Sequence, residues 1–179
     1  MSNTEQQTIT IPAGTFNADA VHSSVAFEVG YMGIGTFSGA VKDFDASLAD
    51  GQLTGAARIA SLETKDENLH AHMLAPDFFD AERHPEVSFS TSGLSSDGDE
   101  VEFTGEITIK GVSRPAVLKG TVVGPVTDPY GNERYGLQLA TTVDRTQFGI
   151  TWNADMPNGT KALADEVTLR ADLSLVKAA

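Results

Sequence analysis

The sequence predicts an all-β protein, an eight-stranded antiparallel barrel with a short helical insertion near residues 64–82. The clearest evidence is the segment 100–110, which reads EVEFTGEITIK and alternates apolar with polar residues. A period of two is that of a strand with one buried and one solvated face. Such a strand is stable only where its apolar face meets others, so the strands should surround a common interior.

Seven further segments show similar apolar patterning, and turn signals rich in glycine, aspartate and asparagine separate many of them. In chain order, the eight expected strands span residues 21–31, 36–48, 53–62, 86–93, 100–110, 115–126, 135–143 and 165–177. An even number of antiparallel strands suits a closed up-and-down barrel.

The alternation also predicts which side chains line the interior, with ordinary core packing as the alternative for each of them. From the strands they are, in order, Val25, Phe27, Val29, Tyr31, Phe37, Phe89, Phe103, Ile107, Ile109, Leu137, Leu139, Leu169 and Leu173. Phe148, Ile150 and Trp152 share one face of the segment FGITW and complete the set.

The segment 64–82, TKDENLHAHMLAPDFFDAE, lacks the alternation and is rich in helix formers. Proline disfavours helix in the residue before it and suits the first turn of a new helix, so two short helical pieces broken at Pro76 are expected. The segment would lie across one end of the barrel as a lid. The alternative is a surface crossover that packs Phe78 and Phe79 into the core.

Small residues at inward positions suggest that the barrel encloses a cavity. Gly39, Gly55, Ala57, Gly105 and Ala171 share the inward face with large apolar neighbours. An eight-stranded barrel is wide enough to be filled by side chains or to hold one small ligand, so the size of the inward residues decides. The alternative is that the glycines mark bulges or bends in the strands.

Composition restricts the setting of the protein. A chain of 179 residues with 40% hydrophobic residues fits a single folded domain over residues 1–179. The formal net charge of −13 disfavours nucleic acid as a partner, and no apolar run is long enough to span a bilayer. Cysteine is absent, and the first ten residues lack a basic start and an apolar stretch, so a cytoplasmic location is expected.

Histidines offer a rival, enzymatic interpretation. His70 and His72 lie near His84 and several carboxylates in the sequence, and imidazole with carboxylate is a ligand set for zinc. On a helix, however, residues two apart point in different directions and share one ion poorly. The sequence also contains no G-x-S-x-G, P-loop or dinucleotide motif. We therefore expect no catalytic residue, metal site or resident cofactor, and keep a metal-dependent enzyme as the alternative.

His22 is the candidate contact for a polar head group. It stands beside Ser23 and Ser24 at the start of the first expected strand. A plain polar cluster at the entry of the strand is the alternative.

Five ordered motifs resemble the YceI family. They are residues 22–29 (HSSVAFEV), 76–89 (PDFFDAERHPEVSF), 105–115 (GEITIKGVSRP), 144–150 (DRTQFGI) and 164–169 (ADEVTL). The resemblance covers about residues 15–176 and implies a lipocalin-like barrel with a long apolar tunnel. It further implies binding of a polyisoprenoid or a similar long-chain amphiphile, such as a quinone-like lipid, and a homodimer. A filled barrel with a structural or stress-related role is a further alternative.

Two departures from the family pattern bear on the head group. The family tends to place a histidine after its first strand motif, where this chain has Gly30 and Tyr31. It also favours an Arg-Asp pair ahead of a histidine, where this chain has Leu69 and His70. The head group is therefore not carried over from the resemblance. The apolar tail alone would contribute roughly 10 kcal/mol gross if several hundred Å² were buried.

Overall fold

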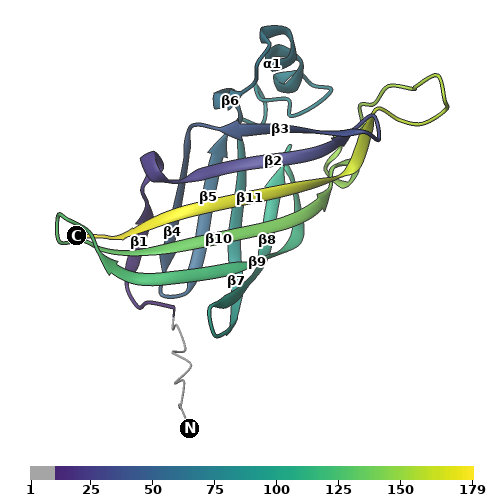
Figure 1. Ribbon diagram of the computed structural model, residues 1–179. Helices are drawn as coiled ribbons and strands as arrows, with labels where there is room; N and C mark the ends of the chain where they lie inside the picture. Colours follow the sequence, from purple (N-terminus) through teal and green to yellow (C-terminus); the bar gives the residue numbers. More distant parts are fainter. Residues whose placement is uncertain (1–10) are drawn as a thin grey trace.

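The computed structural model describes residues 11–179, which form a closed antiparallel barrel with one short α-helix across one end (Figure 1). Its strands are β1 (Thr15–Ala18), β2 (Ser24–Tyr31), β3 (Gly35–Val41), β4 (Phe44–Ala49), β5 (Gln52–Arg58), β6 (Leu62–Glu63), β7 (Glu86–Asp97), β8 (Glu100–Ile109), β9 (Val112–Thr127), β10 (Glu133–Asp144) and β11 (Leu163–Lys177). The helix is α1 (Glu67–Leu74), and 3-10 turns occur at η1 (Ala20–His22), η2 (Ile59–Ser61) and η3 (Arg145–Phe148).

These strands form a barrel of eight, as predicted, because the first three strands of the barrel are each interrupted once. β1 and β2 pair in succession with the same edge of β11, where Leu175 faces Ala18 and Asp172 faces Ser24. In the same way, β4 pairs with β1 and β3 pairs with β2. On the next strand of the barrel, β5 pairs with β4 and β6 pairs with β3. The pairing of β1 with both β4 and β11 closes the ring.

The first strand differs from the prediction, which began it at residue 21. The structure adds β1, whose short sequence TFNA carries little periodic signal, and bends the chain at η1. The side chain of Asp19 caps this turn by accepting a hydrogen bond from the N–H of Val21 at 3.1 Å.

The insertion contains one helix, so the prediction of two helical pieces was wrong. The side chain of Asp66 accepts from the N–H of Leu69 and caps the start of α1. Ala75 is extended, as a residue before proline prefers to be, and ends the helix. After Pro76 the chain forms consecutive turns, with the N–H groups of Phe78 and Asp80 both bonded to the carbonyl of Ala75 at 3.0 Å.

The barrel wall is a continuous sheet at one end only. β9 and β10 pair as far as Lys119 and Ala140; beyond that point β9 continues against β8, and β10 against β11. Near this parting of the strands, η3 follows β10, and Arg114 on β9 donates to the carbonyl of Gln147 at 3.3 Å. In residues 11–179, no helix is long and apolar enough to cross a membrane.

Candidate functional site

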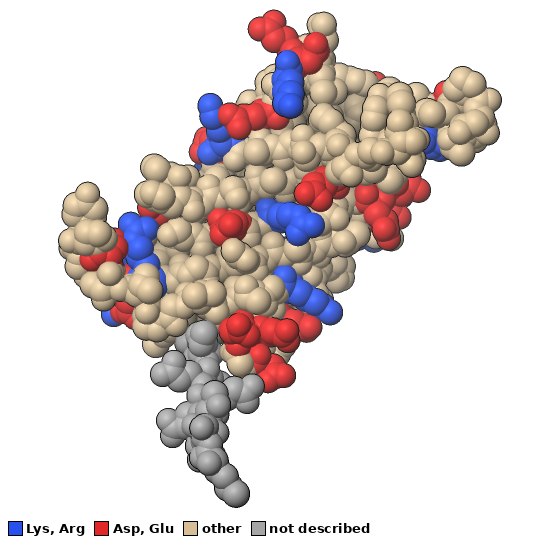
Figure 2. Space-filling view, viewed as in Figure 1, with Lys and Arg blue, Asp and Glu red and all other residues tan. Residues whose placement is uncertain are grey.

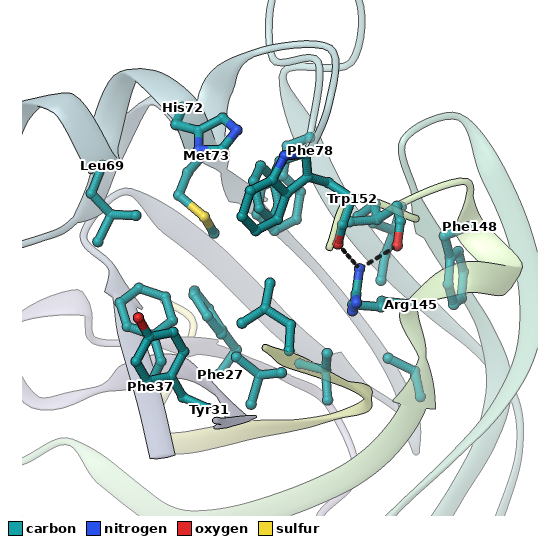
Figure 3. A pocket seen from close by; sticks show the side chains of 17 residues that line it. Phe27, Tyr31, Phe37, Leu69, His72, Met73, Phe78, Arg145, Phe148 and Trp152 are labelled. Carbon is teal, nitrogen blue, oxygen red and sulfur yellow. Dashed lines mark hydrogen bonds between the residues drawn. The ribbon is translucent and has the colours of Figure 1, made fainter. Parts of the chain in front are cut away.

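A cavity of about 470 Å³ lies at the end of the barrel that α1 covers. The strands contribute Phe27, Val29, Tyr31, Phe37, Ile109, Val143, Leu163 and Val167 to its wall, and the other segments contribute Leu69, His72, Met73, Phe78, Phe79, Arg145, Phe148, Ile150 and Trp152 (Figure 3). Polar side-chain atoms come to this set only from His72, Arg145, the hydroxyl of Tyr31 and the indole N–H of Trp152. The size and the apolar wall are typical of sites that enclose one small apolar molecule.

A second cavity, of about 130 Å³, continues the first along the same strands. On β2, Val25 borders the small cavity, and Phe27, two residues on, borders the large one. Ile107 and Ile109 on β8 are divided in the same way. Because alternate residues of a strand face the same side, the two cavities are stacked along the barrel.

The other end of the barrel is filled. Its largest fully buried side chains are Phe16, Leu48, Val101, Phe103, Val122, Leu137 and Leu175. The rings of Phe16 and Tyr135 meet edge to face with their centroids 5.2 Å apart. This packing gives the cavities a closed floor.

The small inward residues have two different roles, so both earlier interpretations hold in part. Gly55, Ala57 and Ala171 line the small cavity. A Cβ on Gly39 would lie 2.7 Å from the ring of Phe27, so this glycine makes room for a side chain. A Cβ on Gly105 would lie 2.0 Å from the carbonyl oxygen of Ser90, next to the bulge in β7. Gly105 therefore permits a close approach of strands and leaves no open volume.

Arg145 joins two segments at the rim of the large cavity. Its side chain is buried, with the residue 5% exposed. Nε donates to the carbonyl of Ala164 at 2.9 Å, and Nη1 donates to those of Ile150 and Trp152, both at 2.8 Å (Figure 3). Burial lowers the pKa of the guanidinium, and the carboxylate of Asp165 lies 3.8 Å from Nη2. Arg145 thus fixes the irregular segment 150–152 against the start of β11.

Three aromatic rings fasten the lid to this rim. The His72 ring on α1 meets Phe78 and Trp152 edge to face, with centroid distances of 4.8 and 4.9 Å. Phe78 and Trp152 also contact each other at 5.3 Å. Lys110, at the β8–β9 turn, adds a hydrogen bond to the carbonyl of Pro76 at 2.5 Å. The lid and the surface-crossover interpretations therefore describe one segment, which covers the cavity and also packs Phe78 into it.

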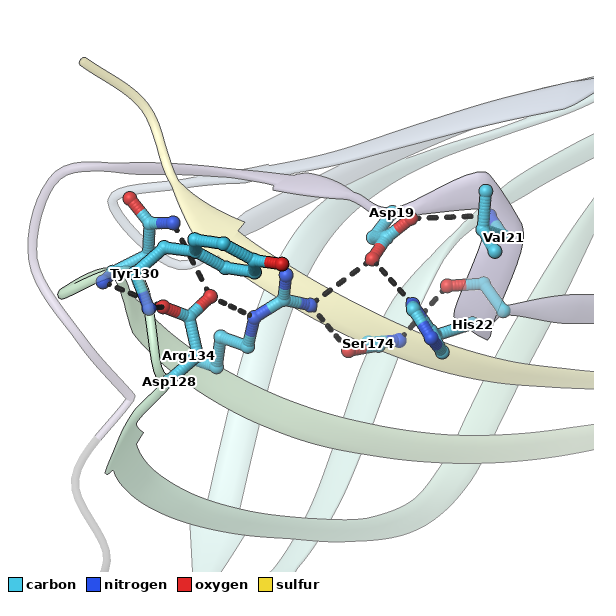
Figure 4. A network of polar contacts seen from close by, with 9 residues as sticks. Asp19, Val21, His22, Asp128, Tyr130, Arg134 and Ser174 are labelled. Carbon is cyan, nitrogen blue, oxygen red and sulfur yellow. Dashed lines mark hydrogen bonds and ion pairs between the residues drawn. The ribbon is translucent and has the colours of Figure 1, made fainter.

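The opposite end of the molecule carries a polar network on the outside of the barrel (Figure 4). Arg134 lies between Asp128, at 2.7 Å from Nε, and Asp19, at 3.1 Å from Nη1. Asp19 also accepts from Nδ1 of His22 at 2.7 Å. The bonds from His22 and Arg134 lower the pKa of Asp19 to about 2, and the bond from Arg134 lowers that of Asp128 well below its usual range.

The predicted lining residues divide among the three levels of the barrel. Phe27, Val29, Tyr31, Phe37, Ile109, Phe148, Ile150 and Trp152 line the large cavity, and Val25, Phe89, Ile107, Leu139, Leu169 and Leu173 line the small one. Phe103 and Leu137 instead belong to the filled end. His22 belongs to the polar network, and its side chain is 68% exposed there.

Sequence reasoning missed Val143 and Val167 within the expected strands, and it missed several lining residues outside them. The lid contributes Leu69, His72 and Met73, and the rim contributes Arg145. The helix-rich composition of the insertion was a signal for the lid residues. Arg145 stands inside the motif DRTQFGI, and its role depends on carbonyl groups that only the fold brings together.

The histidines do not form a metal-binding cluster within the described part of the chain. Over residues 11–179, no three side chains of His, Cys, Asp or Glu come together in a way that could hold an ion. His72 is 3.8 Å from Asp77 and otherwise packs against aromatic rings. The metal-dependent alternative therefore gains no support from this region.

The fold and the site define a class of protein, a closed antiparallel barrel that encloses an apolar cavity under a helical lid. The YceI-like domain matches residues 16–175, and the chain belongs to this family. A UPF0312 protein of Pectobacterium atrosepticum is 27% identical over 143 residues, which is 76% of this chain and 74% of that protein. Protein YceI of Escherichia coli O157:H7 is 27% identical over 136 residues, covering 72% of this chain and 71% of its own length.

Solved structures share the fold at lower sequence identity. BcnA of Burkholderia cenocepacia superposes with a TM-score of 0.69 at 20% identity, covering 90% of this chain and 99% of BcnA. A polyisoprenoid binding domain from Saccharophagus degradans also gives a TM-score of 0.69, at 11% identity, covering 91% of this chain and 98% of that domain.

Proposed function

We propose that this protein binds a polyisoprenoid, or a related long-chain amphiphile such as a quinone-like lipid, inside its barrel. The observation that carries the proposal is the apolar cavity of about 470 Å³, continued along the same strands by one of about 130 Å³. An empty cavity with apolar walls forfeits dispersion contacts, which a hydrocarbon chain restores. The solved Saccharophagus domain, named for polyisoprenoid binding, supports the same class of ligand.

The placement of polar atoms gives the proposed ligand a direction. The closed floor of aliphatic and aromatic side chains suits the end of an apolar tail. Tyr31, His72 and Arg145 bring polar side-chain atoms to the covered end. The tail would therefore point toward the small cavity, with the polar group of the ligand near the lid.

Binding without a catalytic step is the activity we propose, in the role of a carrier, a store or a sequestering protein. The apolar tail of the ligand is recognised by non-directional contacts. One methylene more or less changes the binding free energy by only about 1–3 kcal/mol. Lipids of similar length should therefore compete. The expected homodimer is part of the same proposal.

The direct test is organic extraction of the purified protein followed by mass spectrometry, with protein that was denatured and washed as the control. Recovery of a prenyl chain in roughly equimolar amount would support the proposal. An empty extract, together with no uptake of added prenyl lipids, would contradict it.

Uptake can be followed through Trp152, because it is the only tryptophan in the sequence and it lines the large cavity. A long-chain ubiquinone delivered from detergent should quench its emission until about one equivalent is bound. A prenyl alcohol without a quinone ring should displace the ubiquinone and restore the emission. Quenching that does not saturate would indicate collisions only.

A further inference from the structure

The turn between β2 and β3 presents apolar side chains to solvent. We call Tyr31, Met32, Gly33 and Ile34 the apolar tip. Ile34 is 89% exposed, and Tyr31 and Met32 are 42% and 37% exposed. None of the four residues is charged, whereas the chain as a whole carries a net charge of −13. Large apolar side chains grouped in this way on a surface mark sites of interaction.

The residues of the apolar tip also run against the local preference of the turn. The N–H of Ile34 bonds to the carbonyl of Tyr31 at 3.2 Å, and Met32 and Gly33 have φ of 55° and 71°. A tight hairpin turn with two positive φ angles favours asparagine, aspartate or glycine at both positions. Methionine at the first position gives up local stability, and such exceptions are expected at functional sites.

The apolar tip is continuous with the mouth of the large cavity. Tyr31 both lines that cavity and reaches solvent. The N–H of Met32 bonds to the carbonyl of Ala162 at 2.7 Å, which holds the tip beside the loop of residues 153–162. The turn and this loop project together from the upper right of the barrel in Figure 1.

The neighbouring loop is electrically neutral. Its two charged residues, Asp155 and Lys161, form an ion pair with each other. Figure 2 shows mostly uncharged atoms on this projection, while charged side chains are scattered over the flanks of the barrel. An apolar tip beside a loop with no net charge, on an otherwise acidic protein, is complementary to a surface that is apolar inside and has no net charge.

We propose that the apolar tip inserts into the interface of a lipid bilayer with neutral head groups, and so places the cavity mouth against the membrane. This inference rests on the proposed function, because a prenyl lipid is stored in a bilayer and must leave it to reach the barrel. Ile34 and Met32 would enter the acyl boundary, and Tyr31 would lie at the head-group level that tyrosine prefers.

The test compares vesicle binding of the full chain and of the double variant Met32→Asn/Ile34→Ser. Asparagine suits the positive φ at position 32, so the turn is retained. Neither residue borders the cavity, so uptake from detergent should be unchanged. Tyr130→Ser is the matched control, because Tyr130 is also 89% exposed but lies on the turn before β10, at the other end of the barrel.

On phosphatidylcholine vesicles, the double variant should lose about tenfold or more in partition coefficient, the loss expected when large aliphatic side chains no longer leave water. Tyr130→Ser should bind as the original protein does. Added phosphatidylserine should weaken binding, because the body of the protein is acidic. Equal binding by the double variant, or stronger binding to phosphatidylserine vesicles, would overturn the inference.

Two further outcomes separate this inference from the proposed function. If the protein takes up ubiquinone from detergent but does not bind vesicles, the apolar tip has no membrane role and the lipid-binding function stands. If it takes up no prenyl lipid from detergent, the proposed function itself fails.

A change of oligomeric state in the double variant, measured by sedimentation, would assign the tip to contacts between copies of the chain and would contradict membrane insertion.

Discussion

The two ends of the barrel share the same long strands but differ in what completes the wall. At the filled end, β1 and β4 close the sheet, and the inward side chains of Val101 and Phe103 on β8 are fully packed. At the hollow end, Ile109 on the same strand borders the large cavity, and α1, η3 and the segment 149–152 replace sheet as part of the wall. The cavity therefore arises mainly because strands give way to irregular segments, and small residues contribute a lesser part.

The largest expected effect is a loss of stability from a truncation at the filled end. Phe103→Ala should lower the free energy of unfolding by about 3–5 kcal/mol, because neighbours already packed around the ring cannot fill the space. Phe37→Ala, at the hollow end, should cause less than half that loss, because the side chain already borders a cavity. Urea unfolding monitored by circular dichroism would measure both. Equal losses would remove the distinction between the two ends.

Removal of the buried guanidinium of Arg145 should cause the next largest loss of stability. Arg145→Met leaves three carbonyl groups without their charged donor and should lower the free energy of unfolding by about 3 kcal/mol. The segment 150–152 should loosen, so Trp152 emission should shift to longer wavelength. Arg114→Met, which removes two longer bonds to a single carbonyl, is the matched control. An unchanged Trp152 spectrum in Arg145→Met would show that the rim does not depend on this residue.

The aromatic contacts that hold the lid should contribute a smaller amount to the free energy of unfolding. His72→Ala removes two edge-to-face contacts and should cost about 1 kcal/mol of stability, since aromatic pairs are worth about 0.5–1.5 kcal/mol each. Release of a bound lipid, followed by recovery of Trp152 emission, should become faster. His70→Ala changes a neighbouring histidine that does not border the cavity and should release lipid at the original rate. Equal release from both variants would contradict a lid function for α1.

Acid should affect the polar network at the filled end. The pKa of Asp19 is about 2 in the folded protein, lowered by its bonds to His22 and Arg134, and it is about 3.9 in an unfolded chain. Between about pH 4 and pH 2 the unfolded state therefore binds more protons, so stability falls as the pH falls through this window. Asp19→Asn should have a shallower fall than the original protein in urea unfolding at a series of pH values. The same slope in both proteins would show that Asp19 does not contribute.

The strand content of the fold was predictable because its signal is local. Period-two alternation located all eight barrel strands, although β1 was too short to be detected and the interruptions near Lys42 and Arg58 left little trace in the sequence. The lid was located by composition, but its single helix depended on how the turns after Pro76 pack Phe78. The cytoplasmic location and the homodimer stay predictions.

The candidate site was less predictable because its wall joins segments far apart in the chain. Alternation gave the correct facing of Phe27 and Ile109, but it could not separate them from Phe103, which faces inward at the filled level. Which levels are hollow depends on where β9 and β10 part and on what covers the gap. Arg145 likewise acquires its role only when Ile150 and Ala164 are brought to it.

The central claim, that the hollow end holds the ligand, is tested most directly by a crystal structure of the protein loaded with a prenyl chain that carries bromine at its tail end. The anomalous signal should lie inside the barrel, in the small cavity between Val25, Ile107 and Leu169, with the polar end of the ligand near the lid. Bromine on the outer surface, or a loaded protein with both cavities unoccupied, would contradict the account.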